Sequence, residues 1–232
     1  KFKIGIAVPP INDVDVFSQD LGFIAIVENG ELLGYNLLAG GGMGSTHGDA
    51  RTYPRLADVL GFIRADQLIA AAEAVLTTQR DFGNRSDRKL SRLKYTIDKH
   101  GLAWFIEEIE RRLGEKLPPA REFLFDQSGD RFGWTQGFEG RWHLTLRIES
   151  GRVVDSEKQQ GLTGLRQIAK IHQGDFRLTP NQNLIIAGVA ADQRDVIDLL
   201  VKQYGLDNYQ RSSALRLYAL ACVAFPTCTL AM

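Results

Sequence analysis

The sequence has few of the residues that hold small secreted scaffolds together. It contains only two cysteines in 232 residues, Cys222 and Cys228, which lie near its carboxyl end. A secreted disulfide scaffold usually carries more cysteines, so a disulfide framework is excluded as the basis of the fold. The apolar fraction of 44% is ordinary for a packed protein. The length allows one large domain or two smaller ones.

The sequence also lacks long apolar runs and an excess of either charge. No run approaches the roughly 20 apolar residues that would span a bilayer. The 28 basic and 28 acidic residues balance, so we expect neither nucleic acid nor a membrane as a partner. The opening KFKIGIAVPP has too short an apolar stretch for a signal peptide. It begins like a strand already under way, and the chain ends without a tapering tail. We therefore expect the chain to be part of a longer polypeptide.

The hydrophobic pattern predicts mixed structure in the first half. We expect strands at residues 1–8, 23–27 and 32–38, with a hairpin turn at Asn29-Gly30 between the last two. Helical patterns cover residues 66–80, 87–99 and 102–113, the last ended by Gly114. A linker is expected at residues 117–119.

The second half predicts a small α+β unit. Its strands are expected at residues 142–148, 152–155, 176–178 and 184–188, with a turn at Ser150-Gly151. Its helices are expected at residues 164–172 and 191–204. This order is typical of an antiparallel sheet with helices on one face. A further helix at residues 211–221 would lead to the cysteines.

Two lysines open the sequence in a strand pattern. Lys1 and Lys3 lie two positions apart, so a strand would place both ammonium groups on one face. Two cations on one face can hold an anion and supply protons to it. An edge strand with solvent-facing lysines has the same pattern.

A glycine-rich stretch runs from Gly40 to Gly44. Such a loop lets the backbone approach a ligand closely and can present N–H donors to an anion. It is neither a Walker loop nor a complete dinucleotide fingerprint. An ordinary flexible connection remains the other interpretation.

The densest cluster of basic and polar side chains lies between residues 79 and 94. It comprises Gln79, Arg80, Asn84, Arg85, Arg88, Lys89, Arg92 and Lys94. On a helix, Arg85, Arg88 and Arg92 would share one face. Arginine forks bind carboxylates or phosphates, so a cofactor with many carboxylates fits this cluster. A nucleic-acid backbone fits less well because interleaved aromatic residues are lacking, and a solvated helix face remains open.

The segment ACVAFPTC holds both cysteines. Thiolates bind iron–sulfur clusters, and a 4Fe–4S cluster normally takes four, so Cys222 and Cys228 supply half a set. A buried free-thiol pair, a disulfide or half a zinc site remains open from the spacing alone. The histidines show no metal-ligand spacing and are interpreted as structural or surface residues: His47, His100, His143 and His172.

Taken in order, several segments resemble the siroheme nitrite and sulfite reductase family over nearly the whole chain. They are KFKIGIAVPP, GGGMGSTHG, TTQRDFGNRSDRKLSRLKY, GWTQGFEGRWHLTLRIESGR, IAKIHQGDFRLTPNQNLIIAGV and ACVAFPTCTLAM. In that family a Cys-x3-Cys segment further on completes the cluster ligands. Thr229 stands where the family pattern has Pro.

The resemblance implies an α+β protein that takes part in the six-electron reduction of sulfite to sulfide. It implies siroheme and a 4Fe–4S cluster as cofactors, with Cys222 and Cys228 as cluster ligands. Lys1 and Lys3 would contact the sulfur oxyanion and deliver protons. The candidate siroheme contacts are Gln79, Arg80, Arg88, Arg92, Arg177, Asn181, Gln182 and Asn183.

The resemblance also implies a domain order and a partner. A siroheme-binding α/β lobe would span residues 1–120, a ferredoxin-like half-module residues 121–207, and the start of a cluster lobe residues 208–232. Electrons would come from an NADPH-dependent flavoprotein, which the TTQRD and WHLTLRIESGR segments favour, or from ferredoxin, in the cytoplasm. The rival functions are nitrite reduction and a non-catalytic module that binds an anion or a tetrapyrrole. We expect these 232 residues alone to be inactive.

Overall fold

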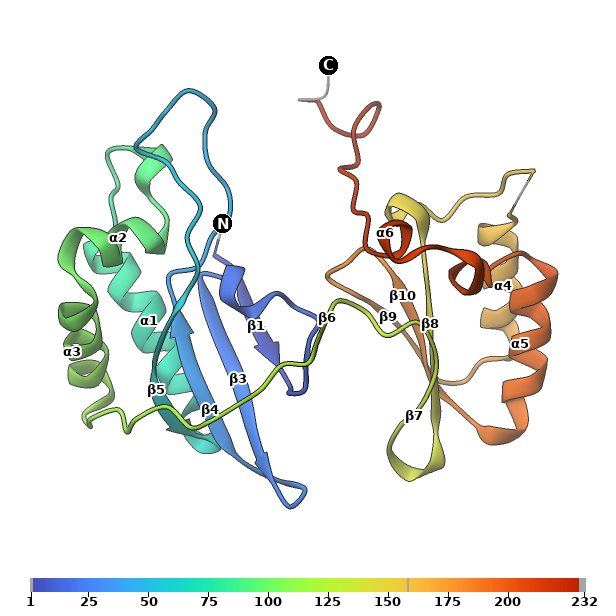
Figure 1. Ribbon diagram of the computed structural model, residues 1–232, viewed down its shortest axis with the longest axis horizontal. Coiled ribbons are helices and arrows are strands. Elements are labelled where there is room, and N and C mark those ends of the chain that lie inside the picture. The colour runs from blue at the N-terminus through green and yellow to red at the C-terminus, as the bar shows by residue number, and fades with distance from the viewer. Residues whose placement is uncertain (1, 158, 230–232) are drawn as a thin grey trace. The chain divides into compact units, whose positions relative to one another are not determined.

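The computed structural model describes residues 2–157 and 159–229. They fall into two compact units that divide between Ser128 and Gly129. Each unit has its own sheet and its own helices (Figure 1). None of the helices in the described residues is long and apolar enough to cross a membrane.

The first unit is built on a mixed sheet of strand order β1-β3-β4-β5. The strands are β1 (Ile4–Ala7), β3 (Leu21–Glu28), β4 (Glu31–Ala39) and β5 (Asp58–Arg64). β1 runs parallel to β3, and the other neighbours are antiparallel. A short parallel pair joins β2 (Ile11–Asn12) to β6 (Gln127–Ser128).

The predicted hairpin is confirmed. Asn29 and Gly30 connect β3 to β4 with φ angles of 54° and 84°. A two-residue turn with positive φ at both positions matches the twist of the flanking strands, and Asn-Gly tolerates it best.

The third strand of this meander, β5, was not predicted. Its sequence contains Gly61, at which a side chain would collide with the carbonyl of Pro118, 2.7 Å from the position of a Cβ atom. The Phe62 amide donates to that same carbonyl over 2.9 Å. The stretch at residues 117–119, expected as a linker, therefore lies against β5 at Gly61 and Phe62.

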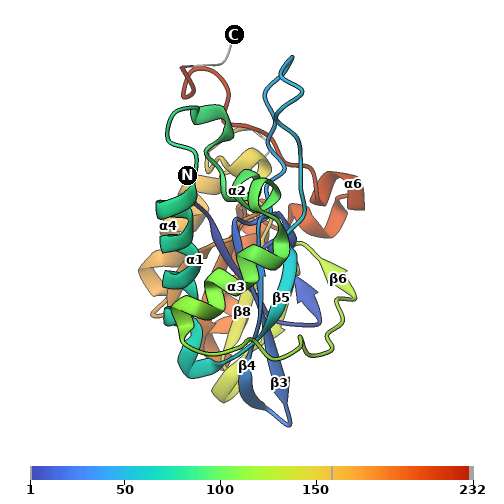
Figure 2. The same ribbon diagram turned by 90° about the vertical axis from the view of Figure 1, so that its left-hand side faces the viewer.

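Three helices cover one face of this sheet (Figure 2). They are α1 (Leu68–Phe82), α2 (Leu93–His100) and α3 (Leu102–Leu113). The predicted end of α3 is confirmed, because Gly114 takes the left-handed conformation that glycine adopts without strain (φ 79°). Short 3₁₀ turns lie at Val16–Ser18, Ala65–Gln67 and Arg88–Leu90.

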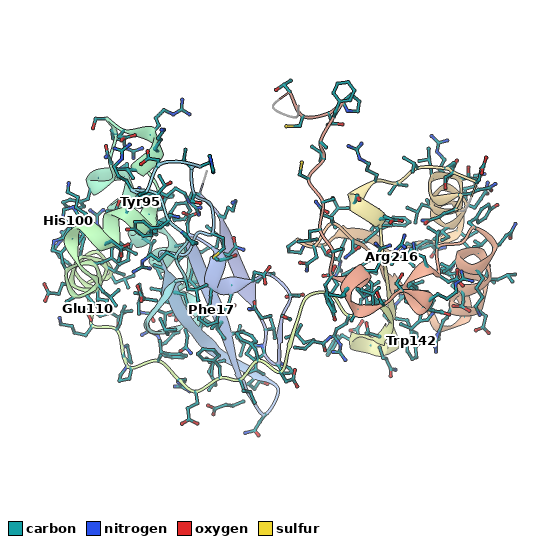
Figure 3. All side chains as sticks on the ribbon, turned by 45° about the horizontal axis from the view of Figure 1, so that its top comes forward. Phe17, Tyr95, His100, Glu110, Trp142 and Arg216 are labelled. Carbon is teal, nitrogen blue, oxygen red and sulfur yellow. The ribbon has the colours of Figure 1, made fainter. Side chains whose placement is uncertain are left out.

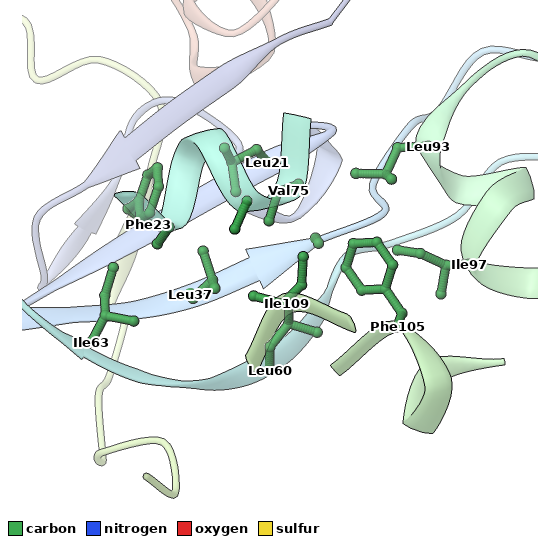
Figure 4. Packing of buried hydrophobic residues seen from close by; sticks show 13 residues of the cluster. Leu21, Phe23, Leu37, Leu60, Ile63, Val75, Leu93, Ile97, Phe105 and Ile109 are labelled. Carbon is green, nitrogen blue, oxygen red and sulfur yellow. The ribbon is translucent and has the colours of Figure 1, made fainter. Parts of the chain in front are cut away.

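The main core of the first unit lies between the sheet and these helices. Phe23 and Leu37 point from the strands toward Val75, Phe105 and Ile109 on the helices (Figure 4). The neighbouring strand residues point the other way. A second cluster there buries Ile24, Leu38 and other residues beneath Phe17, Phe123 and Phe125. Because both faces are covered, β3 reads as a continuous apolar run rather than an alternating one.

The helix predicted over residues 87–99 was wrong at its start. Asn84 Oδ1 accepts the backbone amides of Ser86 and Asp87, and Asp87 Oδ1 accepts the amide of Lys89, each over 3.0 Å. These local side-chain bonds compete with helical hydrogen bonding and favour turns. α2 therefore begins only at Leu93, and Arg85, Arg88 and Arg92 do not share a helical face.

The second unit has the predicted α+β architecture. Its antiparallel sheet has the order β7-β8-β10-β9. The strands are β7 (Gly133–Gln136), β8 (Trp142–Leu146), β9 (Asp175–Leu178) and β10 (Leu184–Val189). The helices α4 (Gly161–Ile171) and α5 (Arg194–Gln203) pack on one face (Figure 1). Further 3₁₀ turns lie at Phe138–Gly140, Glu149–Gly151, Ala191–Gln193 and Asn208–Arg211.

Two local predictions in this unit differ from the structure. Residues 152–155 form no strand and contribute only a single bridge from Asp155 to Gln160. The helix expected at residues 211–221 is reduced to one turn, α6 (Ala214–Leu217). Residues 218–229 then continue without regular structure toward and past the cysteines.

Candidate functional site

A cavity of about 400 Å³ opens in the first unit, between the start of the chain, α1 and the start of α2. Its walls include three of the predicted cofactor contacts, Gln79, Arg80 and Arg92, together with Arg85 and Asp20. Gln79 and Arg80 come from the last turn of α1, and Arg92 directly precedes α2. The fold thus gathers half of the eight-residue cluster around one cavity without making it a helical face.

Asp20 is the buried anion of this cavity, with a relative exposure of 1%. Its carboxylate receives the Arg92 guanidinium over 2.9 and 3.1 Å, which is a bidentate geometry. It also accepts the backbone amide of Lys3 over 3.0 Å. Asp20 therefore ties the segment that carries Lys3 to the cavity. Sequence reasoning missed it, because no local pattern marks an aspartate whose partner lies 72 positions away.

Gln79 lines the cavity and has an unused acceptor. Its Nε2 donates to the Ser91 carbonyl over 2.7 Å. Its Oε1 is buried and has no hydrogen-bond partner among the described residues. A buried acceptor without a donor costs free energy, so this atom suits a bound molecule that offers an N–H or O–H group.

Arg80 and Arg85 are exposed at the cavity mouth. Arg80 pairs with Asp81 over 2.6 Å, and this hydrogen bond raises the pKa of the Arg80 guanidinium. Arg85 donates to the Arg80 carbonyl over 3.1 Å. Arg88 is exposed in its 3₁₀ turn and does not line the cavity.

The structure does not show the two lysines together in the strand that the sequence predicted. Lys3 is exposed and directly precedes β1, so it lies just outside the strand. Lys1 lies outside the described residues. Their shared strand face therefore stays a prediction, and what holds the backbone at Lys3 is Asp20 together with the bond from the Leu21 amide to the Lys3 carbonyl over 3.1 Å.

The glycine stretch is clamped by cations rather than free. Lys94 has a relative exposure of 0% and donates to the carbonyls of Gly42 and Gly44, each over 2.9 Å, and to that of Tyr53. Burial lowers the pKa of this ammonium. Arg92 donates to the Gly41 carbonyl over 3.2 Å.

The backbone amides of the same stretch are largely committed. Gly40, Gly41 and Gly42 donate to carbonyls of the first unit over 2.8–2.9 Å. These three amides therefore hold the loop in place, and the flexible connection considered from the sequence is replaced by a fixed one.

The predicted residues of the second unit surround the turn between β9 and β10. Asp130, with a relative exposure of 5%, accepts Thr179 Oγ1 over 2.6 Å, Asn181 Nδ2 over 3.0 Å and Asn183 Nδ2 over 2.7 Å. Asn183 is buried, and its Oδ1 accepts the Ile148 amide over 2.9 Å. Both asparagines therefore brace the turn. Sequence reasoning missed Asp130, whose partners lie about 50 positions away.

Arg177 and Gln182 are the more accessible members of this group. Arg177 is exposed on the edge strand β9 and pairs with Asp175 over 3.2 Å. Gln182 takes a left-handed conformation with φ 68°, and its side chain reaches the segment before Cys222.

Both cysteines are free thiols in an exposed loop of the second unit. The Ala224 amide donates to Cys222 Sγ over 3.2 Å, and the Cys228 amide donates to the Ala224 carbonyl over 2.8 Å. Nowhere in the described chain do three or more His, Cys, Asp or Glu residues form a group that could hold a metal ion. Two thiols fit half of a 4Fe–4S ligand set, so the remaining ligands would have to come from outside these residues.

Comparison with known proteins gives two family matches along the chain. The model of the nitrite and sulphite reductase 4Fe-4S domain matches residues 1–117. The model of the nitrite/sulfite reductase ferredoxin-like half domain matches residues 136–203.

Individual relatives agree with these matches. The chain is 60% identical over its whole length to the sulfite reductase NADPH hemoprotein beta-component of Myxococcus xanthus, and 61% identical to the protein of that name from Geobacillus kaustophilus. It spans 41% and 40% of those two curated relatives. The solved structure of the NirA protein of Mycobacterium tuberculosis superposes with a TM-score of 0.74 at 25% identity, over 92% of this chain and 38% of that one.

Proposed function

The chain belongs to the nitrite and sulphite reductase family, and from this membership we propose that it is the central part of an enzyme that reduces sulfite to sulfide. The observation that carries the proposal is the identity of about 60% over all 232 residues to proteins named as sulfite reductase hemoproteins. The cavity that gathers Gln79, Arg80 and Arg92 supports it independently.

The proposed cofactors are siroheme and a 4Fe–4S cluster, and the residues present fit them in part. Siroheme carries many carboxylates, which suit the exposed guanidinium groups of Arg80 and Arg85. The cavity lies at the small end of the range for drug-sized ligands, so it suits one side of a macrocycle. Cys222 and Cys228 would bind the cluster, which together with siroheme would pass electrons from an external donor to the substrate.

The chain's own contribution to the reaction is charge and protons. Sulfite is an anion, so the ammonium groups of Lys1 and Lys3 would bind it and stabilise charge as the S–O bonds break. Each oxygen leaves as water after it takes up two protons, and the ammonium groups can donate protons to it. Asp20 would keep the Lys3 backbone in place during this work through its bond to the Lys3 amide.

We propose a flavoprotein that takes electrons from NADPH as the partner, in keeping with the printed names of the relatives. Ferredoxin is the alternative donor. A cytoplasmic location is part of the proposal, because Cys222 and Cys228 are free thiols and reduced thiols persist in that compartment.

The proposal is tested on the complete polypeptide that contains these residues. The wild type should show siroheme absorption and should reduce sulfite, with a higher kcat/KM for sulfite than for nitrite. A higher kcat/KM for nitrite would favour the rival that the family description also covers. A colourless, iron-free protein would instead favour a non-catalytic module and contradict the proposal.

Replacement of Lys3 tests its role directly. The variant Lys3→Met should lower kcat for sulfite by about 100-fold, the smaller end of what a positioned proton donor contributes. Lys99→Met, on the exposed surface of α2, is the matched control and should leave kcat unchanged. Equal activity of Lys3→Met and the control would remove Lys3 from the reaction.

A further inference from the structure

The segment that leads to the cysteines has little structure of its own. Between Ser212 and Thr229 the chain forms only the single turn of α6, and residues 219–227 are exposed. Irregular backbone is held in one place only where its polar groups find partners elsewhere. The position of the Cys loop, residues 221–228, therefore depends on the side chains that reach it.

Three arginine contacts fasten this segment to the turn after β8. Arg147 Nε donates to the Arg216 carbonyl over 3.1 Å, and the Arg216 side chain pairs with Glu149 over 2.8 Å. Arg216 lies on α6, in the first part of the segment from Ser212 to Thr229 (Figure 3). Arg152 donates to the Val223 carbonyl, inside the loop itself.

Gln182 grips the loop at its first residue. Its Nε2 donates to the Ala221 carbonyl over 2.7 Å, and its Oε1 accepts the Ala221 amide over 3.3 Å. Both backbone groups of Ala221 are thus satisfied by one side chain. Asn36 makes the same pair of contacts in the first unit: its Nδ2 donates to the Arg121 carbonyl over 2.7 Å, and its Oδ1 accepts the Arg121 amide over 2.9 Å. It thereby holds a segment without regular structure.

Gln182 is itself held firmly. It lies in the turn between β9 and β10, which Asp130 braces through Thr179, Asn181 and Asn183. The chain of contacts runs from buried Asp130 through this turn to Ala221, and Cys222 follows directly. A rigid support of this kind can hold a metal-binding side chain near its binding geometry before the metal arrives.

We propose that Gln182 is a positioning residue for the Cys loop, which it fixes through Ala221 so that Cys222 is in place to bind metal. The inference rests on the proposed function for the identity of that metal, a 4Fe–4S cluster. Loss of the contact leaves the fold of the second unit intact and frees the loop, so the cluster is released more readily. Outer-shell partners of metal ligands typically change metal affinity by about 10- to 100-fold.

The test compares three variants of the complete polypeptide. Gln182→Asn tolerates the left-handed backbone at this position but is too short to reach Ala221. Gln182→Glu keeps the acceptor for the Ala221 amide and loses the donor to its carbonyl. Gln203→Met, exposed at the end of α5, is the matched control.

The measurement is the rate at which cluster iron passes to a chelator, read with the thermal unfolding midpoint of each protein. Gln182→Asn should release iron about tenfold faster than the wild type or more. Gln182→Glu should fall between the two, and Gln203→Met should match the wild type. The unfolding midpoints should agree, which separates positioning from a general loss of stability.

Three results would overturn the inference, and they differ in what else they affect. If the wild type holds a cluster and Gln182→Asn releases its iron at the wild-type rate, only the positioning role is contradicted. A wild type that never holds a cluster would sink the proposed function as well. Faster release only in proportion to a lowered unfolding midpoint would also count against positioning.

Discussion

At the scale of single residues, the buried ammonium of Lys94 shows how a charge can serve structure. It has no carboxylate partner at hydrogen-bond distance in the described chain. Its Nζ atom donates hydrogen bonds to the carbonyls of Gly42, Gly44 and Tyr53 instead. The rings of Tyr53 and Tyr95 lie 5.7 and 4.9 Å from its Nζ atom. Aromatic faces attract a desolvated cation, which offsets part of the cost of burial.

Removal of this ammonium should destabilise the first unit. Lys94→Met removes the charged donor that links the carbonyls of Gly42, Gly44 and Tyr53, of which only that of Gly42 keeps another donor among the described residues, the Arg55 amide. We expect a loss of about 2–4 kcal/mol in the free energy of unfolding. Urea denaturation followed by circular dichroism measures it. Lys89→Met, exposed in the preceding 3₁₀ turn, should change little by comparison. Equal effects of the two variants would show that the carbonyl contacts of Lys94 contribute nothing.

The sequence pattern singled out polar and basic side chains that line the cavity, but not the aspartates that hold the candidate residues in place. Gln79, Arg80 and Arg92 were expected near a cofactor, and they line one cavity. Asp20 and Asp130 were missed because each gains its role from residues that are far away in the sequence. A single aspartate before a strand or in a loop has no periodicity or spacing that separates it from an ordinary surface residue.

At the scale of elements, α3 joins a predictable helix to an ion-pair network. The apolar spacing and Gly114 were sufficient to predict its extent. Glu108 accepts Arg111 and Arg112 on the same helix, each over 2.7 Å, and Arg112 continues to Asp81 on α1 over 2.9 Å. The network ties α3 to the end of α1, next to Arg80 at the cavity mouth.

The pKa of Glu108 gives this network a pH signature. Hydrogen bonds from Arg111, the larger cause, and from Arg112 lower the pKa of Glu108 from 4.5 to about 2. Because the folded pKa is the lower one, the stabilisation is complete above the unfolded pKa and is lost as the pH falls through the folded pKa. The window therefore runs from about pH 4.5 down to about pH 2.

The variant Glu108→Gln should reveal this contribution. Near neutral pH it should be less stable than the wild type by about 1 kcal/mol, a value appropriate to ion pairs that water still reaches. The difference should shrink as the pH falls below about 4.5. Glu107→Gln, exposed on the same helix, is the control. Urea midpoints measured across this range would contradict the account if the difference between Glu108→Gln and the wild type stayed constant.

The segment between α1 and α2 shows where pattern reasoning fails at this scale. Charge spacing suggested a helix there, yet Asn84 and Asp87 bond to nearby backbone amides and turn the chain. Residues of this type favour turns for that reason, but the sequence alone does not show whether helix or turn prevails. The arginines consequently reach the cavity from a loop and a helix start.

At the scale of the whole molecule, the predicted architecture was α+β with a ferredoxin-like half-module, and the structure and family matches confirm it. The candidate residues divide between the two units. Lys3, Gln79, Arg80, Arg88 and Arg92 belong to the first, and the β9–β10 turn and both cysteines belong to the second. The proposal requires the remaining cluster ligands to come from the longer polypeptide.

The most direct test of this claim is the iron and siroheme content of the complete polypeptide, measured by metal analysis, absorption and electron paramagnetic resonance. The wild type should hold both cofactors with coupled signals, and Cys228→Ser should lose the cluster signal. These 232 residues alone should hold no complete cluster and reduce no sulfite. A complete polypeptide whose Cys228→Ser variant keeps the wild-type cluster signal would contradict the account.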